Sequence, residues 1–210
     1  MEATPIASAA TRKAAVFFDG NNWFHALMEH VQGDRSGVMD YSALVGWIVA
    51  QLCETLNWPK ATVIAETWYY TAVPEDEPNF KEGLLNFLRK LEREGIHVEK
   101  FPTRSCLLTC TNCEDRLVCA KCEKNMMRLE EEQVDVALAV KSVWLAMRRE
   151  VDVVVLISGD GDFVPAVVAV QKEGIPVVIA APDLGGVSRR LRDAGARELE
   201  LAPGIRQCMR

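Results

Sequence analysis

Apolar residues along this chain occur in two kinds of segment. Short, almost continuous apolar runs such as VDVVVLIS (151–158) are typical of strands buried on both faces of a sheet. Longer segments place an apolar residue at every third or fourth position, as Leu44, Ile48 and Leu52 do, which is typical of helices with one buried face. Runs of the first kind predict strands at 14–18, 61–70, 96–101, 151–158 and 176–181 and a short edge strand at 196–201.

Segments of the second kind lie between these strands and predict helices. The predicted helices span 22–30, 41–56, 80–94, 126–149, 163–172 and 188–193. In the third of them the residues expected to face inward are Leu84, Phe87, Leu88 and Leu91. In the long helix 126–149 the expected apolar face contains Val136, Val140, Val143 and Met147. Strand and helix alternate throughout, so the pattern predicts a doubly wound α/β sheet.

The same pattern indicates one domain with two less regular parts. Residues 1–12 have no apolar core behind a basic region, so they predict a short disordered leader rather than a secretory signal. The domain is expected at 13–203, with one cysteine-rich insert at 104–125. No apolar run approaches the roughly 18–20 residues that a membrane helix needs. We therefore expect no membrane association and a cytoplasmic location.

Charge narrows the class of partner. The 24 Lys and Arg residues are outnumbered by 30 Asp and Glu residues, which gives a net charge of −6. This balance argues against a protein that coats nucleic acid through bulk electrostatic attraction. It leaves room for a local basic groove around an acidic centre, because a bound metal ion reverses the sign of the local field.

Two of the predicted strands end in acidic residues. The first runs into Asp19 and the amides Asn21 and Asn22, and the central strand runs into Asp160 and Asp162. Ligands of open α/β sheets bind beyond the carboxyl ends of the strands, and hard cations such as Mg²⁺ and Mn²⁺ prefer carboxylate oxygens. The alternative is that Asp160 and Asp162 only cap the following helix. Capping leaves Asp19 unexplained, so the sequence favours a metal site.

The helix before the central strand carries a further acid among apolar residues. Asp135 stands in VDVALAV, and its simplest alternative role is a solvent-facing acid in a first helical turn. Strand-DGNN, VDVALAV and VVVLISGDGDFVPAVVAVQKEGIPVVIAA together resemble the NYN domain, the LabA-like branch of the PIN-like nuclease superfamily. The resemblance covers roughly 13–201 and is most specific over 134–181. It implies a three-layer α/β/α PIN-like fold with a mostly parallel central sheet, and a metal-dependent ribonuclease site.

The resemblance also implies roles for individual residues. The positions that match the family's catalytic residues are Asp19, Asn22, Asp135, Asp160 and Asp162. Three of these, Asp19, Asp135 and Asp160, would hold Mg²⁺ or Mn²⁺, directly or through water. Asp162 would orient a metal-bound water or cap the helix. Ser158 matches the serine of the family's SGDxDF loop and Ser188 a Ser-x-x-Leu feature near its C-terminus, and both are predicted to bind substrate.

One position departs from the family pattern. The family's helix has a second acid six residues after the first, and here that position is Lys141. The lysine either weakens the metal site or contacts a substrate phosphate. Two further candidates for substrate binding are Trp23, as a ring on which a base stacks, and Arg189, in the densest basic run. A solvated helix face is the common alternative for Arg189.

Five of the seven cysteines crowd into the insert. Cys110-x₂-Cys113 and Cys119-x₂-Cys122 form two Cys-x-x-Cys pairs, and Cys106 is a possible substitute for one of these four. Four thiolates suit a structural Zn²⁺ ion, whereas a loop with free or redox-active thiols is the alternative. The insert is expected beside the mouth of the acidic site, where it either grips a nucleic-acid strand or partner or only closes the fold.

Two functions follow from these observations. The first is a metal-dependent ribonuclease that acts on RNA, preferably single-stranded or locally unpaired. The second is a non-catalytic NYN domain that binds RNA or a protein partner and regulates it. Lys141 favours the second function, and the DGNN and SGDGDF motifs favour the first. A protein partner or a homodimer is compatible with both.

Overall fold

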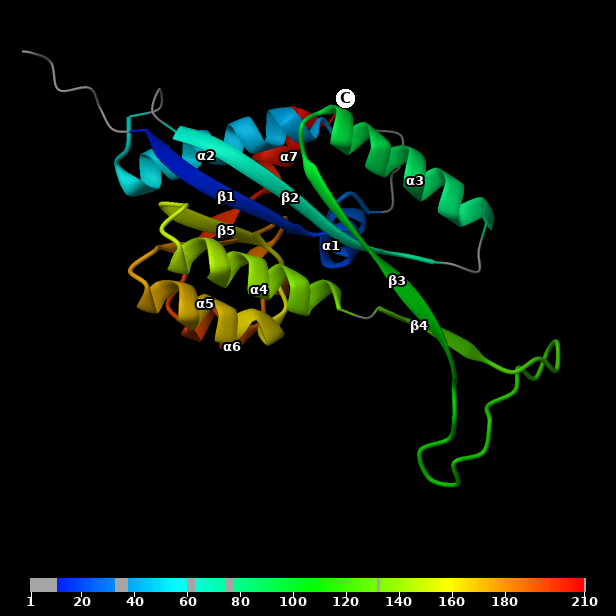
Figure 1. Cartoon of the computed structure of the whole chain (residues 1–210). Coiled ribbons are helices and arrows are strands. Elements are labelled where there is room, and N and C mark those ends of the chain that lie inside the picture. Colours follow the sequence, from blue (N-terminus) through cyan, green and yellow to red (C-terminus); the bar gives the residue numbers. More distant parts are fainter. Residues whose placement is uncertain (1–10, 33–37, 60–62, 75–77, 132, 210) are drawn as a thin grey trace, which may run out of the picture.

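A mostly parallel sheet forms the middle of the molecule (Figure 1). The computed structural model describes residues 11–32, 38–59, 63–74, 78–131 and 133–209. The sheet has seven strands in the order β4-β3-β2-β1-β5-β6-β7. Its strands are β1 (Arg12–Asp19), β2 (Val63–Val73), β3 (His97–Leu107), β4 (Met127–Glu131), β5 (Val153–Ile157), β6 (Val177–Ala181) and β7 (Arg197–Glu200). Only the pairing of β4 with β3 is antiparallel.

Helices cover both faces of this sheet and give it two separate cores. The helices are α1 (Gly20–His30), α2 (Tyr41–Leu56), α3 (Pro78–Arg93), α4 (Val134–Met147), α5 (Val164–Lys172), α6 (Arg189–Asp193) and α7 (Ala202–Cys208). One core joins α1, α2, α3 and α7 to alternate residues of β1, such as Val16 and Phe18. The other joins α4, α5 and α6 to the opposite face, through Ala15 and Phe17. The predicted three-layer α/β/α architecture is confirmed.

Most strands and helices lie where the hydrophobic pattern predicts them. Helix α2 has the predicted bounds, and α3 buries Leu88 and Leu91 as expected. Strand β7 is an edge strand, again as predicted. Strong periodicity and long apolar runs identify these elements because tertiary packing agrees with the local pattern.

The predicted helix at 126–149 is wrong in its first third. The structure has strand β4 at Met127–Glu131, and α4 begins only at Val134. Strand β3 extends six residues beyond the predicted end of its strand, to Leu107, and β4 pairs with this extension. Gln133 then adopts a left-handed backbone with φ of 75°, which separates the strand from the helix. The long-range pairing with β3 therefore overrides the local preference for helix.

The apolar face predicted for this helix is wrong at three of its four positions, whereas the fourth, Val143, is partly buried and packs against the second core. Val136 is 67% exposed and Met147 is 64% exposed, and Val140 is exposed as well. The buried face is formed by Val134, Leu138, Ser142, Leu145 and Ala146. Both sets of residues repeat at helical spacing, and the set with small Ser142 and Ala146 lets α4 lie close against β1 and β2.

The ends of the domain differ from the predicted bounds 13–203. Strand β1 begins at Arg12, within the predicted leader, and the leader's residues 1–10 lie outside the described residues. At the other end α7 packs against α2, and its Ile205 and Cys208 belong to the core. Within the described part of the chain, no helix combines the length and apolar character that a bilayer crossing requires.

Candidate active site

Asp19 is the last residue of β1 and lies at the carboxyl end of the parallel strands. Its side chain is only 4% exposed. Oδ1 of Asp19 accepts a hydrogen bond from the backbone N–H of Asn22 at 3.4 Å, so the residue also caps α1. Oδ2 accepts a hydrogen bond from the hydroxyl of Ser158 at 2.8 Å. A buried carboxylate is thus fixed in place from two directions.

The loop after β5 lies directly beside Asp19. Phe18 and Ile157 are paired across β1 and β5, so Ser158 follows at the same level as Asp19. The hydroxyl of Ser158 donates to Asp19 and accepts the backbone N–H of Asp160 at 3.1 Å. The side-chain oxygen of Asn22 accepts the N–H of Gly159 at 3.0 Å. These bonds tie the DGNN and SGDGD motifs into one network.

Asp160 has a capping role in addition to its place beside Asp19. Its Oδ1 accepts the N–H of Asp162 at 2.9 Å, at the start of the 3₁₀ helix η2 (Gly161–Phe163). The prediction that one of the two aspartates caps a helix is confirmed, and that residue is Asp160. Asp162 is exposed. One oxygen of Asp160 is used by the cap, which leaves its second oxygen for another partner.

Ser188 and Gly161 lie close together and shape the loop after β5. The N–H of Ser188 donates to the carbonyl of Gly159 at 2.8 Å. A Cβ atom added to Gly161 would lie 2.7 Å from Oγ of Ser188, so any larger residue there would force the Ser188 side chain to move. Ser188 therefore sets the position of the loop.

The electrostatics of the site are dominated by burial and like charge. The pKa of Asp19 is raised to about 6, chiefly by burial and to a smaller extent by the nearby carboxylates of Asp135 and Asp160, against the lowering effect of the hydrogen bonds from Ser158 and Asn22. Asp135 lies in the first turn of α4 and is exposed, as the alternative prediction of a solvent-facing acid has it, and yet partial burial of its carboxyl group and the charges of Asp160 and Asp162 raise its pKa. Four carboxylates from β1, α4 and the β5 loop therefore act on one another, and a cation among them would relieve this repulsion.

The donor chemistry of this cluster fits a hard divalent cation. Among the residues that the structure describes, no three Asp, Glu, His or Cys side chains are already arranged to hold a metal ion. Mg²⁺ is commonly held by one or two carboxylates and several waters, so a complete set of protein ligands is not required. Asp19, Asp135 and Asp160 are the residues that would hold such an ion, in part through water.

The structure gives different surroundings to two residues predicted to bind substrate. Trp23 is 1% exposed, and its indole N–H donates to the hydroxyl of Tyr41 at 3.0 Å. No face of this ring is free for a base, so the prediction of a stacking platform is wrong. Ser158 is 2% exposed and bonded to Asp19, which makes it a positioning residue rather than a contact for substrate. Hydrophobic spacing within α1 did not reveal the burial of Trp23, because the core beneath it comes from other elements.

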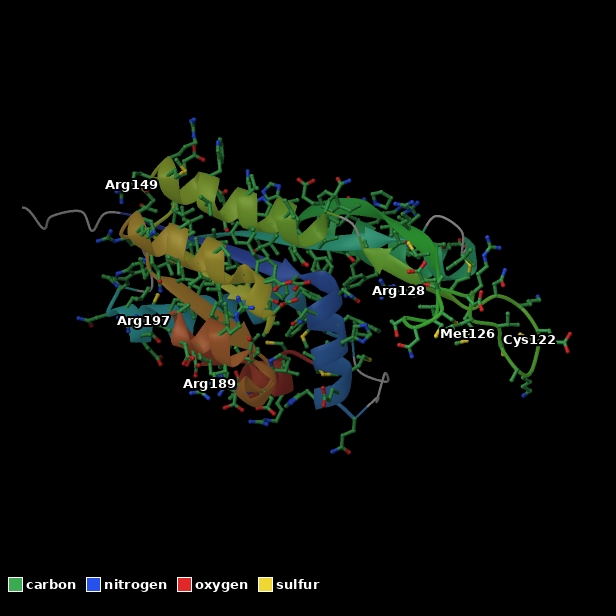
Figure 2. All side chains as sticks on the ribbon, turned by 90° about the horizontal axis from the view of Figure 1, so that it is seen from below. Cys122, Met126, Arg128, Arg149, Arg189 and Arg197 are labelled. Carbon is green, nitrogen blue, oxygen red and sulfur yellow. The ribbon has the colours of Figure 1, made fainter. Side chains whose placement is uncertain are left out.

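Two further residues predicted to bind substrate lie on helices, Lys141 on α4 and Arg189 on α6. The ammonium group of Lys141 lies 4.9 Å from the ring centroid of Trp144 and 5.6 Å from that of Trp68. This cation–π arrangement stabilises its charge without a carboxylate. The side chain of Arg189, labelled in Figure 2, is 92% exposed. Its Nε lies 3.6 Å from Oδ2 of Asp193 one turn later, as expected for a solvated helix face.

The cysteine segment projects from the same edge of the sheet as the acids. Parallel strands β1, β2 and β3 end at one edge, and β3 continues beyond it before β4 returns toward α4 and Asp135. Residues 108–126, which we call the arm, connect these two strands (Figure 1). The predicted insert at 104–125 is therefore shorter at its start, where β3 extends to Leu107.

Comparison with known proteins identifies the family of the chain. The family model of the NYN domain matches residues 13–201. The chain belongs to the NYN domain family. This NYN domain is similar in structure to a protein of unknown function from Vibrio parahaemolyticus RIMD 2210633, at 20% identity and a TM-score of 0.59, over 95% of this chain and 99% of that one.

A weaker likeness involves MurG from Acinetobacter baumannii. It has 14% identity and a TM-score of 0.33, over 80% of this chain and 35% of that one. A TM-score this low does not indicate a shared fold. No curated protein matches the sequence. The Vibrio structure shares the fold, and the family match indicates a nuclease-type domain.

Proposed function

We propose that this NYN domain is a metal-dependent ribonuclease that hydrolyses phosphodiester bonds of single-stranded or locally unpaired RNA. The observation that carries the proposal is that Ser158 ties the loop of Asp160 to the buried Asp19, while Asp135 on α4 lies near enough to raise the pKa of Asp19. Repulsion among Asp19, Asp135 and Asp160 raises the free energy of the metal-free site, and a divalent cation offsets it. Membership of a nuclease-type family supports the same reaction class.

Each part of the network has a task in this reaction. Asp19, Asp135 and Asp160 would hold Mg²⁺ or Mn²⁺, and the ion would supply charge stabilisation at the phosphate and lower the pKa of a water. Ser158 keeps the Asp19 carboxylate turned toward the β5 loop. Asn22 holds Gly159 and with it the start of that loop. Asp162, exposed two residues after Asp160, would orient a water that approaches the phosphate.

Cleavage assays on the full chain test this proposal. The substrates are a single-stranded RNA, a hairpin RNA and a DNA strand of the same sequence, each with Mg²⁺, with Mn²⁺ and with EDTA. Cleavage of unpaired RNA is expected only with metal, and Asp19→Asn and Asp160→Asn are expected to reduce it at least about a hundredfold. Activity that survives EDTA or both substitutions would contradict the proposal.

A matched control separates the site from general charge effects. Asp152 is a partly exposed acid at the opposite ends of β1 and β5, where it bonds Arg12 and the N–H of Lys13. Asp152→Asn removes the same charge and is expected to leave cleavage unchanged. A loss of activity in this variant equal to that in Asp19→Asn would show that stability, not the site, controls the rate.

A non-catalytic regulator that binds RNA or protein is the second candidate. It is favoured by Lys141, a cation on α4 where the family has a carboxylate, and by its pairing with two tryptophan rings. In this case the chain binds RNA in a mobility-shift assay without cleavage, and Asp19→Asn does not change the affinity. Metal-dependent cleavage rules this candidate out.

A further inference from the structure

The arm contains two turns of the same construction. In the first, the N–H of Glu114 donates to the carbonyl of Cys110 at 2.9 Å, and the N–H of Cys110 donates to the carbonyl of Asp115 at 2.8 Å. In the second, the equivalent bonds join Glu123 to Cys119 at 2.8 Å and Cys119 to Lys124 at 2.9 Å. The two turns therefore repeat one backbone structure nine residues apart.

The resemblance extends to the backbone angles and the flanking pairs. Glu114 and Glu123, each directly after a second cysteine, have left-handed φ angles of 61° and 53°. Each turn is closed by an antiparallel bridge, Thr109 with Arg116 in the first and Val118 with Asn125 in the second. Left-handed conformations are unfavourable for glutamate, so their repetition at the same place indicates that the turn shape is specified by the sequence.

Both turns direct backbone N–H groups at the sulfur of their first cysteine. Cys110 accepts hydrogen bonds from the N–H groups of Asn112 and Cys113 and from the thiol of Cys113. Cys119 accepts the equivalent bonds from Lys121 and Cys122. In each turn the two sulfurs are neighbours, which is the arrangement that two ligands of one metal ion need. We call these turns, residues 110–113 and 119–122, the two knuckles.

The arm has no core of its own that would hold the knuckles in place. Its three short segments meet through backbone bonds from Leu108 to Met126, from Leu117 to Leu108 and from Met126 to Leu117. At and next to this junction Leu108 is partly buried, whereas five other large apolar residues are 39–52% exposed: Leu107, Leu117, Val118, Met126 and Met127. So small a segment with exposed apolar side chains needs a covalent or metal staple to be stable. Figure 2 shows Met126 and Cys122 extending away from the body of the domain.

We propose that the two knuckles of one chain close on a single Zn²⁺ ion, held by Cys110, Cys113, Cys119 and Cys122, and that this ion orders the arm. In the described conformation each knuckle is a half-site with two sulfurs, and no three cysteines of the described chain are yet grouped. The five residues between Cys113 and Cys119 form the hinge for closure. Four soft thiolates favour Zn²⁺ over Mg²⁺ or Mn²⁺, so this site is distinct from the acidic one.

Metal content of the full chain tests the proposal. The protein is purified under reducing conditions, loaded with Zn²⁺ alone and freed of excess ion. About one zinc per chain is expected, released when a mercurial reagent blocks the thiols. With Co²⁺ instead, the absorption of tetrahedral thiolate coordination is expected. Less than about half an equivalent of zinc, or a cobalt spectrum without thiolate bands, would overturn the proposal.

Three variants distinguish this site from binding by any group of cysteines. Cys110→Ser and Cys119→Ser each remove a ligand from a different knuckle, and both are expected to lower zinc affinity at least about tenfold. The matched control is Cys106→Ser, a cysteine of the same region in β3 but outside both knuckles, which is expected to keep full affinity. Equal loss in all three variants, or loss in only one knuckle variant, would overturn the four-ligand site.

The oligomeric state separates closure within one chain from zinc shared between chains. Sedimentation of the protein with and without zinc is expected to give the same mass. A zinc-dependent dimer with one ion per two chains would overturn closure within the chain. Because the arm lies outside both cores, each variant is expected to keep the thermal unfolding transition of the domain, which shows that a lost zinc site is not a lost fold.

Discussion

At the scale of single residues, Asp19 shows how the fold fixes a buried carboxyl group at the edge of the sheet. The sequence predicts its place, because a strand of a parallel sheet ends there. Its partner Ser158 was predicted only as a substrate contact, through the family resemblance. The hydrogen bond between them depends on the register of β1 and β5, and register between two strands 139 residues apart is set by packing rather than by local sequence.

Because the pKa of Asp19 is raised in the folded state, ionisation of Asp19 lowers the free energy of unfolding. The folded-state pKa is about 6 and the unfolded value lies near 3.9, so the folded state binds the proton more tightly. Proton binding by Asp19 therefore stabilises the folded state at low pH, and this stabilisation is lost as pH rises through about 6. Asp19→Asn removes the ionisation, and we expect it to raise the free energy of unfolding by about 1–2 kcal/mol near pH 7 without metal.

Denaturant unfolding in EDTA measures this effect. The gain from Asp19→Asn should shrink as pH falls from about 7 to about 4, because wild-type Asp19 is then protonated in the folded state. Asp152→Asn, at a partly exposed acid, is the control, and it is expected to bring no gain near pH 7 because it weakens the contacts with Arg12 and Lys13. A destabilised Asp19→Asn variant near pH 7 would contradict the account.

Ser158→Ala removes the hydroxyl that donates to Asp19 and accepts from Asp160. We expect a loss of about 1–2 kcal/mol of stability near pH 7, because the Asp19 carboxylate and a backbone N–H lose a buried partner. Ser142→Ala is the matched control, since this buried serine bonds only the carbonyl of Ala139 within its own helix. Chemical denaturation measures the free energy of unfolding of both variants. Equal losses would show that the bonds of Ser158 to the site stabilise the fold no more than an ordinary buried hydroxyl does.

At the scale of elements, α4 shows what the hydrophobic pattern leaves open. Its sequence has apolar residues on nearly every side, and two faces repeat at helical spacing. Local periodicity cannot choose between them, and the sheet selects the face with small residues near its centre. Strand β4 was missed for a related reason, because its partner is the extended end of β3 rather than a neighbour in sequence.

A pair of substitutions tests the orientation of α4. Leu138 is 1% exposed and Val136 is 67% exposed, two positions apart on the same helix. Leu138→Ala should cost about 2–5 kcal/mol through the cavity it leaves, whereas Val136→Ala should change stability by less than about 0.5 kcal/mol. Thermal or denaturant unfolding of both variants gives the comparison, and a larger cost at Val136 would reverse the assigned face.

At the scale of the whole molecule, the strand order brings the site and the arm to one edge. The α/β class and the place of the acids could be predicted, because alternating strands and helices put strand ends on a common edge. The antiparallel edge formed by β3 and β4, and the seventh helix that closes the first core, could not be predicted from local pattern. Both depend on contacts between segments far apart in the sequence.

The arm should be dispensable for the fold of the domain. None of the core residues comes from 108–126. Replacing these residues with a short turn between β3 and β4 is therefore expected to change the free energy of unfolding by less than about 1 kcal/mol. Circular dichroism and denaturant unfolding measure this, and an unfolded deletion variant would show that the arm supports the sheet.

We propose above that Asp19, Asp135 and Asp160, at the carboxyl edge of the parallel strands, hold a divalent cation. Calorimetric titration of Mn²⁺ into the metal-free protein, beside Asp19→Asn and Asp152→Asn, tests it most directly. We expect binding to the wild type and Asp152→Asn, its loss in Asp19→Asn, and a wild-type affinity that falls about tenfold per pH unit below about 6, where protons compete for Asp19. Absence of Mn²⁺ binding to the wild type, or equal binding to all three proteins, would contradict the account.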